Sequence, residues 1–409
     1  MKAQPPCRSC GTDKLVAILS LGNTPLANSL LAAEQLGDPE PTYPLDLVLC
    51  PACALVQITE TVPPEKLFRD YVYFSSFSDT MLSHARELAE TMVERRSLTR
   101  DSLVVEAASN DGYLLRFYKE HGIDVLGIEP ALNVARVAAQ NGIPTLPEFF
   151  DADLARRLVV ESRPANVFHA HNVLAHVADL NGFVRGISVV LAEDGVAVVE
   201  VPYVKDMLDR CEFDTIYHEH LCYFSVTSLA RLFERHGLVL ADVERVPIHG
   251  GSLRLAVEHS RRGRPLPAVR SLLAEERSWG VEGQGVYRGF ARRVNELAAS
   301  LLELVGGLKA DGCRLAAYGA AAKGSTLLNV VGIGTETLEF VVDRSTAKQG
   351  LYMPGTHLPI APPERLLEEM PDYVLVLAWN LADEIIAQQD EYRRRGGKFI
   401  IPVPEPRVI

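Results

Sequence analysis

The sequence predicts an α/β protein of three domains: an N-terminal four-cysteine zinc module, a central Rossmann-like domain and a C-terminal Rossmann-like α/β domain. Three observations lead to this prediction. Two Cys-x-x-Cys pairs lie near the N-terminus, apolar strand-like segments alternate with helical segments in the middle of the chain, and a shorter alternation of the same kind follows residue 312. We place the domains at residues 1–70, 71–245 and 246–409.

Length and composition are those of a soluble, multidomain protein. The 409 residues exceed the roughly 100 to 200 residues of one ordinary domain. Apolar residues make up 47% and charged residues 23%, as in typical globular proteins. The net charge of -12 argues against a nucleic-acid partner, because phosphate binding requires clustered lysine and arginine. No apolar run approaches the ~18 residues of a membrane span, and the N-terminus lacks the apolar segment of a signal peptide. We therefore expect a cytoplasmic protein without a membrane partner.

The two cysteine pairs predict a structural zinc site. Cys7 and Cys10 form the first pair, Cys50 and Cys53 the second, and each pair lies in a polar or proline-rich turn. Four thiolates can hold zinc tetrahedrally and leave no open position for catalysis. A redox pair or a coincidence is the alternative, and the redox reading is disfavoured because no thioredoxin-like βαβ pattern surrounds either pair. Residues 45–49 form a plausible strand that leads into the second pair.

The central segment has the pattern of a doubly wound sheet. A helical period runs over residues 79–96, and a buried strand over 102–107 is followed by a tight turn and a helix that begins near Tyr113. Further strands are expected at 124–130, 165–171 and 195–201. In such sheets, ligands bind at the carboxyl ends of the strands.

The turn after the first central strand favours S-adenosylmethionine over a dinucleotide. It has one glycine, and it carries acids where a diphosphate would be repelled, whereas the methionine part of the cofactor is cationic. Glu129, at the end of the next strand, is placed to contact ribose hydroxyls, and Asn172 is expected to line the opening where the methyl group is transferred. A helix-capping role is the alternative for Glu106. The residues expected to bind the cofactor are Glu106, Ser109, Asn110, Asp111, Gly112, Glu129 and Asn172.

The segment 214–220 concentrates groups that transfer protons: Tyr217, His218, Glu219 and His220 are consecutive. A His-x-His pair alone has three readings, a metal site, a satisfied pair in the core, or a general base with a pKa near 6.5. The metal reading lacks a convincing third ligand. The histidines at 169, 171 and 176 are better explained as structural polar contacts.

The C-terminal third predicts a helical stretch over 266–308 and then a small α/β domain. A strand at 313–319 leads into a loop, residues 319–324, whose backbone N–H groups and Lys323 could meet a diphosphate. An ordinary loop lysine is the alternative. Further strands are expected at 338–342 and 373–378.

Taken together, these motifs resemble the sugar C-methyltransferases of deoxysugar biosynthesis. The resemblance rests on the paired cysteines, the Glu-x-x-Ser-Asn-Asp-Gly turn and Tyr-His-Glu-His, with further blocks at 71–76, 249–254, 319–329 and 342–357. It implies a zinc module, a class I methyltransferase domain that binds S-adenosylmethionine, and a C-terminal domain, with a nucleotide sugar bound between the last two. Family members typically methylate a carbon beside the ketone of a dTDP-4-keto-deoxysugar.

The resemblance also implies roles for individual residues. His220 is the base, with Tyr217 and Glu219 beside it as catalytic residues. The residues expected to contact the substrate are Tyr73, His218, Lys323 and Asn329. Ala108 departs from the family, whose members often carry glycine there, and could narrow the approach to the methionine moiety.

We therefore expect an S-adenosylmethionine-dependent enzyme that methylates C3 of a nucleotide-linked keto-deoxysugar through an enolate. One alternative keeps the scaffold but methylates an O, N or C atom of a non-sugar metabolite. Another is a non-catalytic zinc-ribbon binding protein. The sequence is compatible with a monomer or a homodimer.

Overall fold

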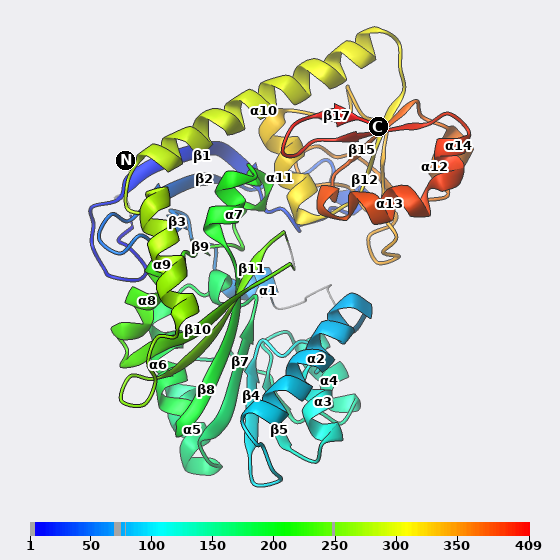
Figure 1. The fold of residues 1–409 in the computed structure, drawn as a ribbon. Helices are drawn as coiled ribbons and strands as arrows, with labels where there is room; N and C mark the ends of the chain where they lie inside the picture. Colours follow the sequence, from blue (N-terminus) through cyan, green and yellow to red (C-terminus); the bar gives the residue numbers. More distant parts are fainter. Residues whose placement is uncertain (1–4, 69–74, 78, 248–249) are drawn as a thin grey trace.

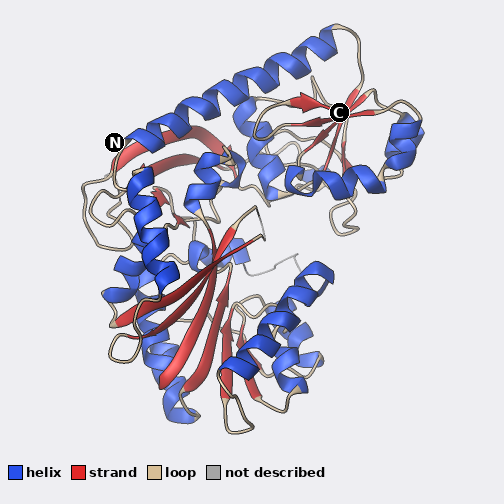
Figure 2. Ribbon diagram, in the orientation of Figure 1, coloured by secondary structure: helices blue, strands red, loops and turns tan. Residues whose placement is uncertain are grey.

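The computed structural model describes residues 5–68, 75–77, 79–247 and 250–409, and it has the predicted α/β architecture with a cysteine module at the N-terminus (Figure 1). Its strands form three separate sheets of four, seven and six strands. Helices cover the faces of the two larger sheets (Figure 2). Within these described ranges, no helix combines the length and the apolar character needed to cross a membrane.

The N-terminal sheet has the order β1-β2-β3-β9, with β1 Val16–Pro25, β2 Thr42–Leu49, β3 Val56–Ile58 and β9 Cys222–Tyr223. The strand predicted at 45–49 is the second half of β2. Both cysteine pairs lie in hydrogen-bonded turns, in which Gly11 N–H donates to the Cys7 carbonyl and Ala54 N–H to the Cys50 carbonyl. The fourth strand was not predicted. It comes directly after the Tyr-His-Glu-His segment, so this segment is attached to the zinc module by an antiparallel strand pair.

The central sheet has the order β10-β11-β8-β7-β4-β5-β6. Its strands are β4 Leu103–Ala107, β5 Asp124–Ile128, β6 Thr145–Leu146, β7 Ala165–His171, β8 Leu191–Pro202, β10 Leu238–Val246 and β11 Ser252–His259. The four strands predicted here are present, and their pairing is parallel. β11 runs antiparallel to both β8 and β10, which the sequence did not predict. This hairpin extends the central sheet beyond the boundary proposed at residue 245.

Alternate residues of the central strands pack against helices on opposite faces of the sheet. Val104 and Val167 face α2 and α3, while Val105 and Phe168 face α5 and α6. On the second face, Phe168 packs against Phe150 with ring centroids 4.8 Å apart. The helices are α1 Pro64–Phe68, α2 Asp79–Arg95, α3 Leu115–Glu120, α4 Leu132–Gln140, α5 Ala152–Glu161, α6 Leu180–Val190, α7 Val204–Asp209 and α8 Val226–Glu234.

The helical stretch predicted at 266–308 consists of two helices, α9 Pro267–Trp279 and α10 Gly285–Ala310. In Figure 1, α10 runs along the top of the molecule from the N-terminal module to the C-terminal domain. Because its buried residues Phe290 and Leu301 belong to the same core as the zinc module, this helix connects the domains through apolar contacts.

The C-terminal sheet has the order β14-β13-β12-β15-β16-β17 and is parallel except for β17. The strand predicted at 338–342 is shorter, because only Val341–Val342 pairs as β13. β12 and β15 are neighbours. The loop predicted at 319–324 is shorter, because α11 begins at Ala322 and Lys323 lies in its first turn. Trp379 begins a short 3-10 helix just after β15. The elements are β12 Leu315–Tyr318, α11 Ala322–Val331, β14 Ile360–Ala361, α12 Arg365–Glu369, β15 Tyr373–Val376, α13 Ala382–Gln388, α14 Asp390–Arg394, β16 Lys398–Ile401 and β17 Arg407–Val408.

Candidate active site

The turn after β4 has an unusual backbone. Ala108, Asn110 and Gly112 have φ angles of 55°, 49° and 79°, in the left-handed region that side chains rarely adopt. Gly112 is required for a second reason, since a Cβ there would lie 2.7 Å from Cγ1 of Ile143. These angles fold the turn back on itself at the carboxyl end of β4. The turn therefore presents its polar groups at the edge of the sheet where ligands bind.

The cofactor residues predicted in this turn lie together, and three of them have buried polar atoms without a hydrogen-bond partner in the described part of the chain. Glu106 is completely buried, and neither of its carboxylate oxygens has a hydrogen-bond partner among the described residues. The same holds, within those ranges, for Ser109 Oγ and Asp111 Oδ1. Burial raises the pKa of Glu106 well above its usual value, and the nearby carboxylates of Glu129 and Asp111 raise it further. A cationic ligand with donor groups would relieve both the charge repulsion and the missing hydrogen bonds, and S-adenosylmethionine is such a ligand.

Glu129 and Asn172 complete this edge. Glu129 Oε2 accepts from Asn110 N–H at 3.0 Å and Oε1 from Ala131 N–H at 2.9 Å, so it supports the turn after β4. Burial raises its pKa, while these two backbone bonds lower it. Asn172 follows β7 with a φ of 53°, and its Oδ1 is buried without a partner in the described structure. Tyr73, predicted to contact the substrate, lies outside the described residues.

A buried polar chain lies beside the predicted cofactor residues. His171 Nδ1 is 3.1 Å from Glu200 Oε2, and His169 Nδ1 is 2.9 Å from His171 Nε2. Burial alone would raise the pKa of Glu200, but His171 and the neighbouring His84 and Arg254 hold it well below its usual range. The contacts of His169 and His171 fit the structural role expected for them. Glu200, His84 and Arg254 were not predicted, because they come from three separate elements with no common motif.

The segment 217–220 divides its side chains between two directions. Tyr217 and His220 are partly exposed, whereas His218 and Glu219 are buried. His220 Nδ1 lies 2.8 Å from the Thr215 carbonyl oxygen, and His220 Nε2 lies 2.9 Å from the Tyr217 hydroxyl. A carbonyl oxygen only accepts hydrogen bonds, so Nδ1 carries the proton and Nε2 carries the lone pair, which accepts from the Tyr217 hydroxyl. This is the arrangement of a neutral imidazole that can take up a proton at Nε2.

His176 also lies at this site, with its ring centroid 4.8 Å from that of His220. Burial lowers the pKa of His176 to about 4, so its ring is neutral at pH 7. The backbone N–H of Leu221 donates to the Ala175 carbonyl at 2.8 Å, which holds the two segments together. The sequence favoured a purely structural role for His176, and only the fold brings it against His220.

The buried pair, His218 and Glu219, contacts the zinc module. His218 Nε2 donates to the Pro44 carbonyl at 3.2 Å, and its ring packs edge-on against Tyr43. Glu219 Oε1 accepts from Asn28 Nδ2 at 2.7 Å. Burial raises the pKa of Glu219 to about 7, although the Asn28 hydrogen bond lowers it. Asn28 was not predicted, because nothing around it in the sequence marks it.

The start of the segment contacts the C-terminal domain instead. Trp379 Nε1 donates to Asp214 Oδ2 at 2.6 Å, and Lys323 Nζ lies 4.9 Å from the centroid of the Trp379 ring. Burial raises the pKa of Asp214 to about 6 and that of Glu212 to about 7, while the charge of Lys323 lowers both. Lys323 Nζ is buried and has no hydrogen-bond acceptor in the described part of the chain. A polyanion would supply the missing acceptors.

Asn329, also predicted to contact the substrate, lies on α11 and makes contacts within the chain. Its Nδ2 donates to the carbonyls of Ser325 at 2.8 Å and Pro354 at 3.0 Å. Gly355 follows with a φ of 73°, and a Cβ there would lie 2.0 Å from Asn329 Oδ1. Asn329 therefore holds the turn at 354–357 against α11.

The four cysteines of the N-terminal module converge. Their sulfur atoms all lie within 4.8 Å of one another, and the Cys7–Cys53 and Cys10–Cys50 pairs are 3.5 Å apart. A tetrahedral zinc ion with Zn–S bonds of about 2.3 Å requires sulfur atoms roughly 3.8 Å apart. The set fits zinc, and all seven cysteines of the chain are free thiols.

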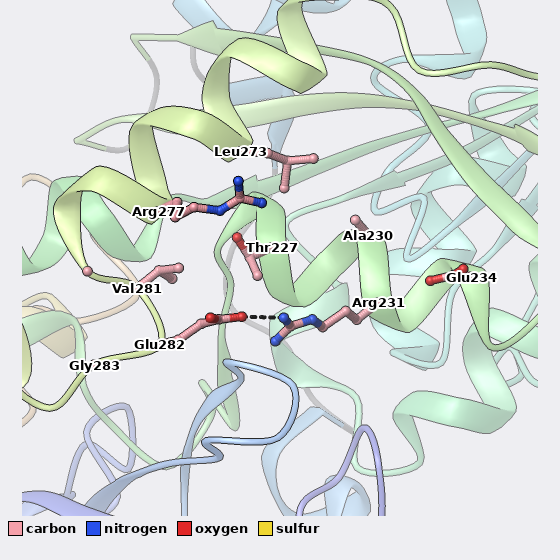
Figure 3. Close-up of a pocket in the computed structure, with 10 residues that line it drawn as sticks. Thr227, Ala230, Arg231, Glu234, Leu273, Arg277, Val281, Glu282 and Gly283 are labelled. Carbon is pink, nitrogen blue, oxygen red and sulfur yellow. Dashed lines mark hydrogen bonds and ion pairs between the residues drawn. The ribbon is translucent and has the colours of Figure 1, made fainter.

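A hollow of about 370 Å³ lies between α8, α9 and the turn that follows α9 (Figure 3). Arg231 and Glu282 form an ion pair at its rim, and Arg277 lies near Thr227 in the same view. None of the predicted site residues lines this hollow. The candidate active site is instead formed by the turn after β4, the segment 214–220, the first turn of α11 with Lys323, and Trp379 after β15.

Comparison with known proteins identifies the domains. Residues 7–68 match a zinc binding domain, residues 81–243 a methyltransferase domain, and residues 247–404 a C-methyltransferase C-terminal domain. The chain is 42% identical to C-methyltransferase NovU of Streptomyces niveus over 408 residues, which cover 98% of this chain and 96% of NovU.

Among solved structures, the likenesses are weaker. The PH0226 protein of Pyrococcus horikoshii OT3 is 13% identical with a TM-score of 0.38, and the match covers 49% of this chain and all of that one. The magnesium protoporphyrin IX methyltransferase ChlM of Synechocystis, solved with bound S-adenosylmethionine, is 13% identical with a TM-score of 0.33, covering 46% of this chain and 85% of that one.

The fold, the acidic turn after β4 and the matched methyltransferase domain define an S-adenosylmethionine-dependent methyltransferase with a zinc-binding module. More narrowly, the match to NovU over nearly the whole of both chains and the C-terminal domain match show that the chain belongs to a family of C-methyltransferases. The predictions of fold class, enzyme class and cofactors are thereby confirmed.

Proposed function

We propose that this enzyme methylates C3 of a dTDP-linked 4-keto-deoxysugar, with His220 as the general base. The observation that carries the proposal is the hydrogen bonding of His220. Its Nδ1–H is held by the Thr215 carbonyl, and its Nε2 electron pair faces the Tyr217 hydroxyl at 2.9 Å. A carbon beside a ketone loses its proton only to a positioned base, and an imidazole fixed in this tautomer can accept that proton at Nε2.

In the proposed reaction, the proton of the substrate carbon passes to His220 Nε2, and the electrons of the C–H bond shift to the ketone oxygen. The Tyr217 hydroxyl, which donates to Nε2 before substrate binds, then donates to the developing enolate oxygen. S-adenosylmethionine supplies the electrophilic methyl group. Glu219 is assigned to orient the substrate or a neighbouring group, because it lies in the same segment and is fixed by Asn28.

The substrate side of the site is assigned to the C-terminal domain, at the start of α11. Lys323, whose buried ammonium group lacks a hydrogen-bond acceptor within the described chain, is proposed to bind the diphosphate. His218 and Asn329 are assigned an indirect part, because both are engaged with backbone carbonyls. Nucleotide-linked sugars and similar small molecules are the expected partners.

A single assay tests this function. The enzyme is incubated with S-adenosylmethionine and a panel of dTDP-4-keto-deoxysugars in deuterated water, and the products are analysed by mass spectrometry and NMR. We expect loss of the C3 proton and gain of one methyl group on that carbon for at least one sugar. Methylation on a hydroxyl group, or only of a non-sugar acceptor, would contradict the proposal.

The base is tested by His220→Asn. This variant should lose methyl transfer by about 10²-fold or more, because no other group replaces the proton acceptor. Its affinity for S-adenosylmethionine, measured by calorimetry, should stay near that of the parent. Methyl transfer at the parent rate would remove His220 from the mechanism.

A further inference from the structure

The segment 214–220, called the catalytic segment below because it contains the proposed base, is held in place by a tryptophan of the C-terminal domain. Trp379 follows β15, and its indole N–H donates to Asp214 Oδ2 at 2.6 Å across a separation of 165 residues. Asp214 is fully buried, so the bond is shielded from water. A charge-assisted hydrogen bond of this kind is stronger than one between neutral groups.

Asp214 lies one residue before the group that orients the base. The Thr215 carbonyl accepts from His220 Nδ1 at 2.8 Å, and residues 213–215 form one short 3-10 turn. The backbone of this turn cannot shift at Asp214 without moving the Thr215 carbonyl. A movement of that oxygen would break its hydrogen bond with the Nδ1–H group. The ring could then adopt the other tautomer, in which Nε2 carries the proton and cannot accept another.

Other contacts of Asp214 do not replace the tryptophan. Its second oxygen, Oδ1, is buried and has no hydrogen-bond partner among the residues the structure describes. Lys323 contributes charge, since it lies over the Trp379 ring and lowers the pKa of Asp214, but no direct hydrogen bond joins the two side chains in the described structure. The backbone N–H groups of Asp214 and Thr215 also stabilise the carboxylate, but both belong to the turn itself. Among the described residues, the indole N–H is the side-chain donor that ties this carboxylate to the C-terminal domain.

We propose that Trp379 is a positioning residue for His220: through Asp214 and the Thr215 carbonyl, it selects the tautomer in which Nε2 can accept a proton. The C-terminal domain would then contribute to the chemistry as well as to substrate binding. This inference rests on the proposed role of His220 as the base.

The variant Trp379→Phe tests it, because phenylalanine keeps an aromatic ring beneath Lys323 but has no N–H. The chain offers a matched control in its second tryptophan: Trp279 Nε1 also donates to an aspartate, Asp209, at 2.9 Å, outside the catalytic segment. Histidine ¹⁵N NMR of the zinc-loaded proteins reports the tautomer of His220 without any substrate. The signals are assigned by their loss in His220→Asn.

We expect His220 to be the Nδ1–H tautomer in the parent and in Trp279→Phe, and a mixture of tautomers in Trp379→Phe. With a keto-sugar that the parent enzyme methylates, kcat of Trp379→Phe should fall by about 10- to 100-fold, because the base is misplaced. KM for both substrates should stay within about twofold, because the binding groups remain. Asp214→Asn, which keeps an oxygen to accept the indole N–H, should retain most of the activity that Asp214→Ala loses. The double variant Trp379→Phe/Asp214→Ala should lose no more activity than the more impaired of the two single variants.

The outcomes separate the inference from the proposed function. A parent-like tautomer and kcat in Trp379→Phe would overturn the inference, even if His220→Asn is inactive. A change of tautomer with no methylation of any keto-sugar by the parent would leave the positioning contact standing and remove the proposed substrate. Additive losses in the double variant would also contradict a path that runs from Trp379 through Asp214.

Discussion

Among the individual residues of the site, Glu219 shows how burial changes a carboxylate. It is 5% exposed, one of its oxygens accepts from Asn28, and its pKa is raised to about 7. The folded protein therefore holds the Glu219 proton more tightly than the unfolded chain does. Between the unfolded pKa of about 4.5 and the folded pKa of about 7, stability falls as pH rises, and the full cost is present above pH 7.

The variant Glu219→Gln should remove this cost, because glutamine keeps an oxygen for Asn28 and cannot ionise. We expect it to be more stable than the parent at pH 8 by up to about 3 kcal/mol, and to lose most of this advantage at pH 5. Urea unfolding at the two pH values measures the difference. Glu94→Gln, at an exposed position on α2, is the control and should change little. A pH-independent difference would show that ionisation of Glu219 is not the cause.

Individual residues also show which parts of a site can be predicted from a sequence. Residues 217–220 and the turn 106–112 could be chosen as candidates from the sequence, because the groups of each set lie within a few neighbouring positions. Asn28, Trp379 and His176 could not be assigned roles in this way. Each acts through a contact with a residue more than 40 positions away, and no local pattern marks it.

At the scale of single elements, the turn after β4 combines a ligand edge with backbone strain. Ala108 adopts a φ of 55°, a conformation that costs an L-residue about 1 kcal/mol or more compared with glycine. Glycine adopts this conformation without that cost. Alanine at this position is therefore tolerated by the fold, at some cost in stability.

The substitution Ala108→Gly should stabilise the protein by roughly 0.5–1 kcal/mol, since the relief of strain exceeds the entropy lost by glycine. The neighbouring Ala107 is the matched control, because it is buried in β4, where glycine should destabilise by about 1 kcal/mol. Urea titration gives the free energies of unfolding of the parent and of both variants, and these are compared. Equal destabilisation by both substitutions would mean that Ala108 is not strained.

Element prediction succeeded where the period of apolar residues is long and regular. α2 and the parallel strands β4, β5, β7 and β8 follow from such patterns. β9 and the antiparallel β11 do not, because β9 has two residues and the direction of β11 depends on the turn before it. Which strands pair with each other depends on the folded sheet, and the alternation of apolar and polar side chains along one strand does not determine its neighbours.

For the molecule as a whole, the zinc module and the candidate active site are joined by hydrogen bonds. β9 pairs with β3, and the Ile58 N–H donates to the Leu221 carbonyl at 3.1 Å, directly beside the segment 214–220. The cofactor edge at β4, β5 and β7 is built from other strands. Loss of the metal should therefore affect turnover more than cofactor binding.

The variant Cys50→Ser tests this separation. We expect it to lose zinc and turnover, and its melting midpoint should fall by at least about 5 °C, because the metal no longer holds the two cysteine turns together. Its affinity for S-adenosylmethionine, measured by calorimetry, should fall by less than about tenfold. Cys313→Ser, outside the cysteine cluster, should behave like the parent. Normal turnover without zinc would show that the module does not support the catalytic segment.

The pairing of β9 with β3 also has a consequence for biosynthesis. The first three strands of the N-terminal sheet leave the ribosome early, but the outer edge of β3 finds its partner only after Tyr223 has been made. Domains usually fold in order during synthesis, at about 5–20 residues per second. This N-terminal domain cannot do so fully, and β3 keeps an open edge for many seconds, during which another chain could pair with it. A lower concentration of nascent chains, obtained by weaker transcription, or added chaperones should therefore improve the yield of soluble protein.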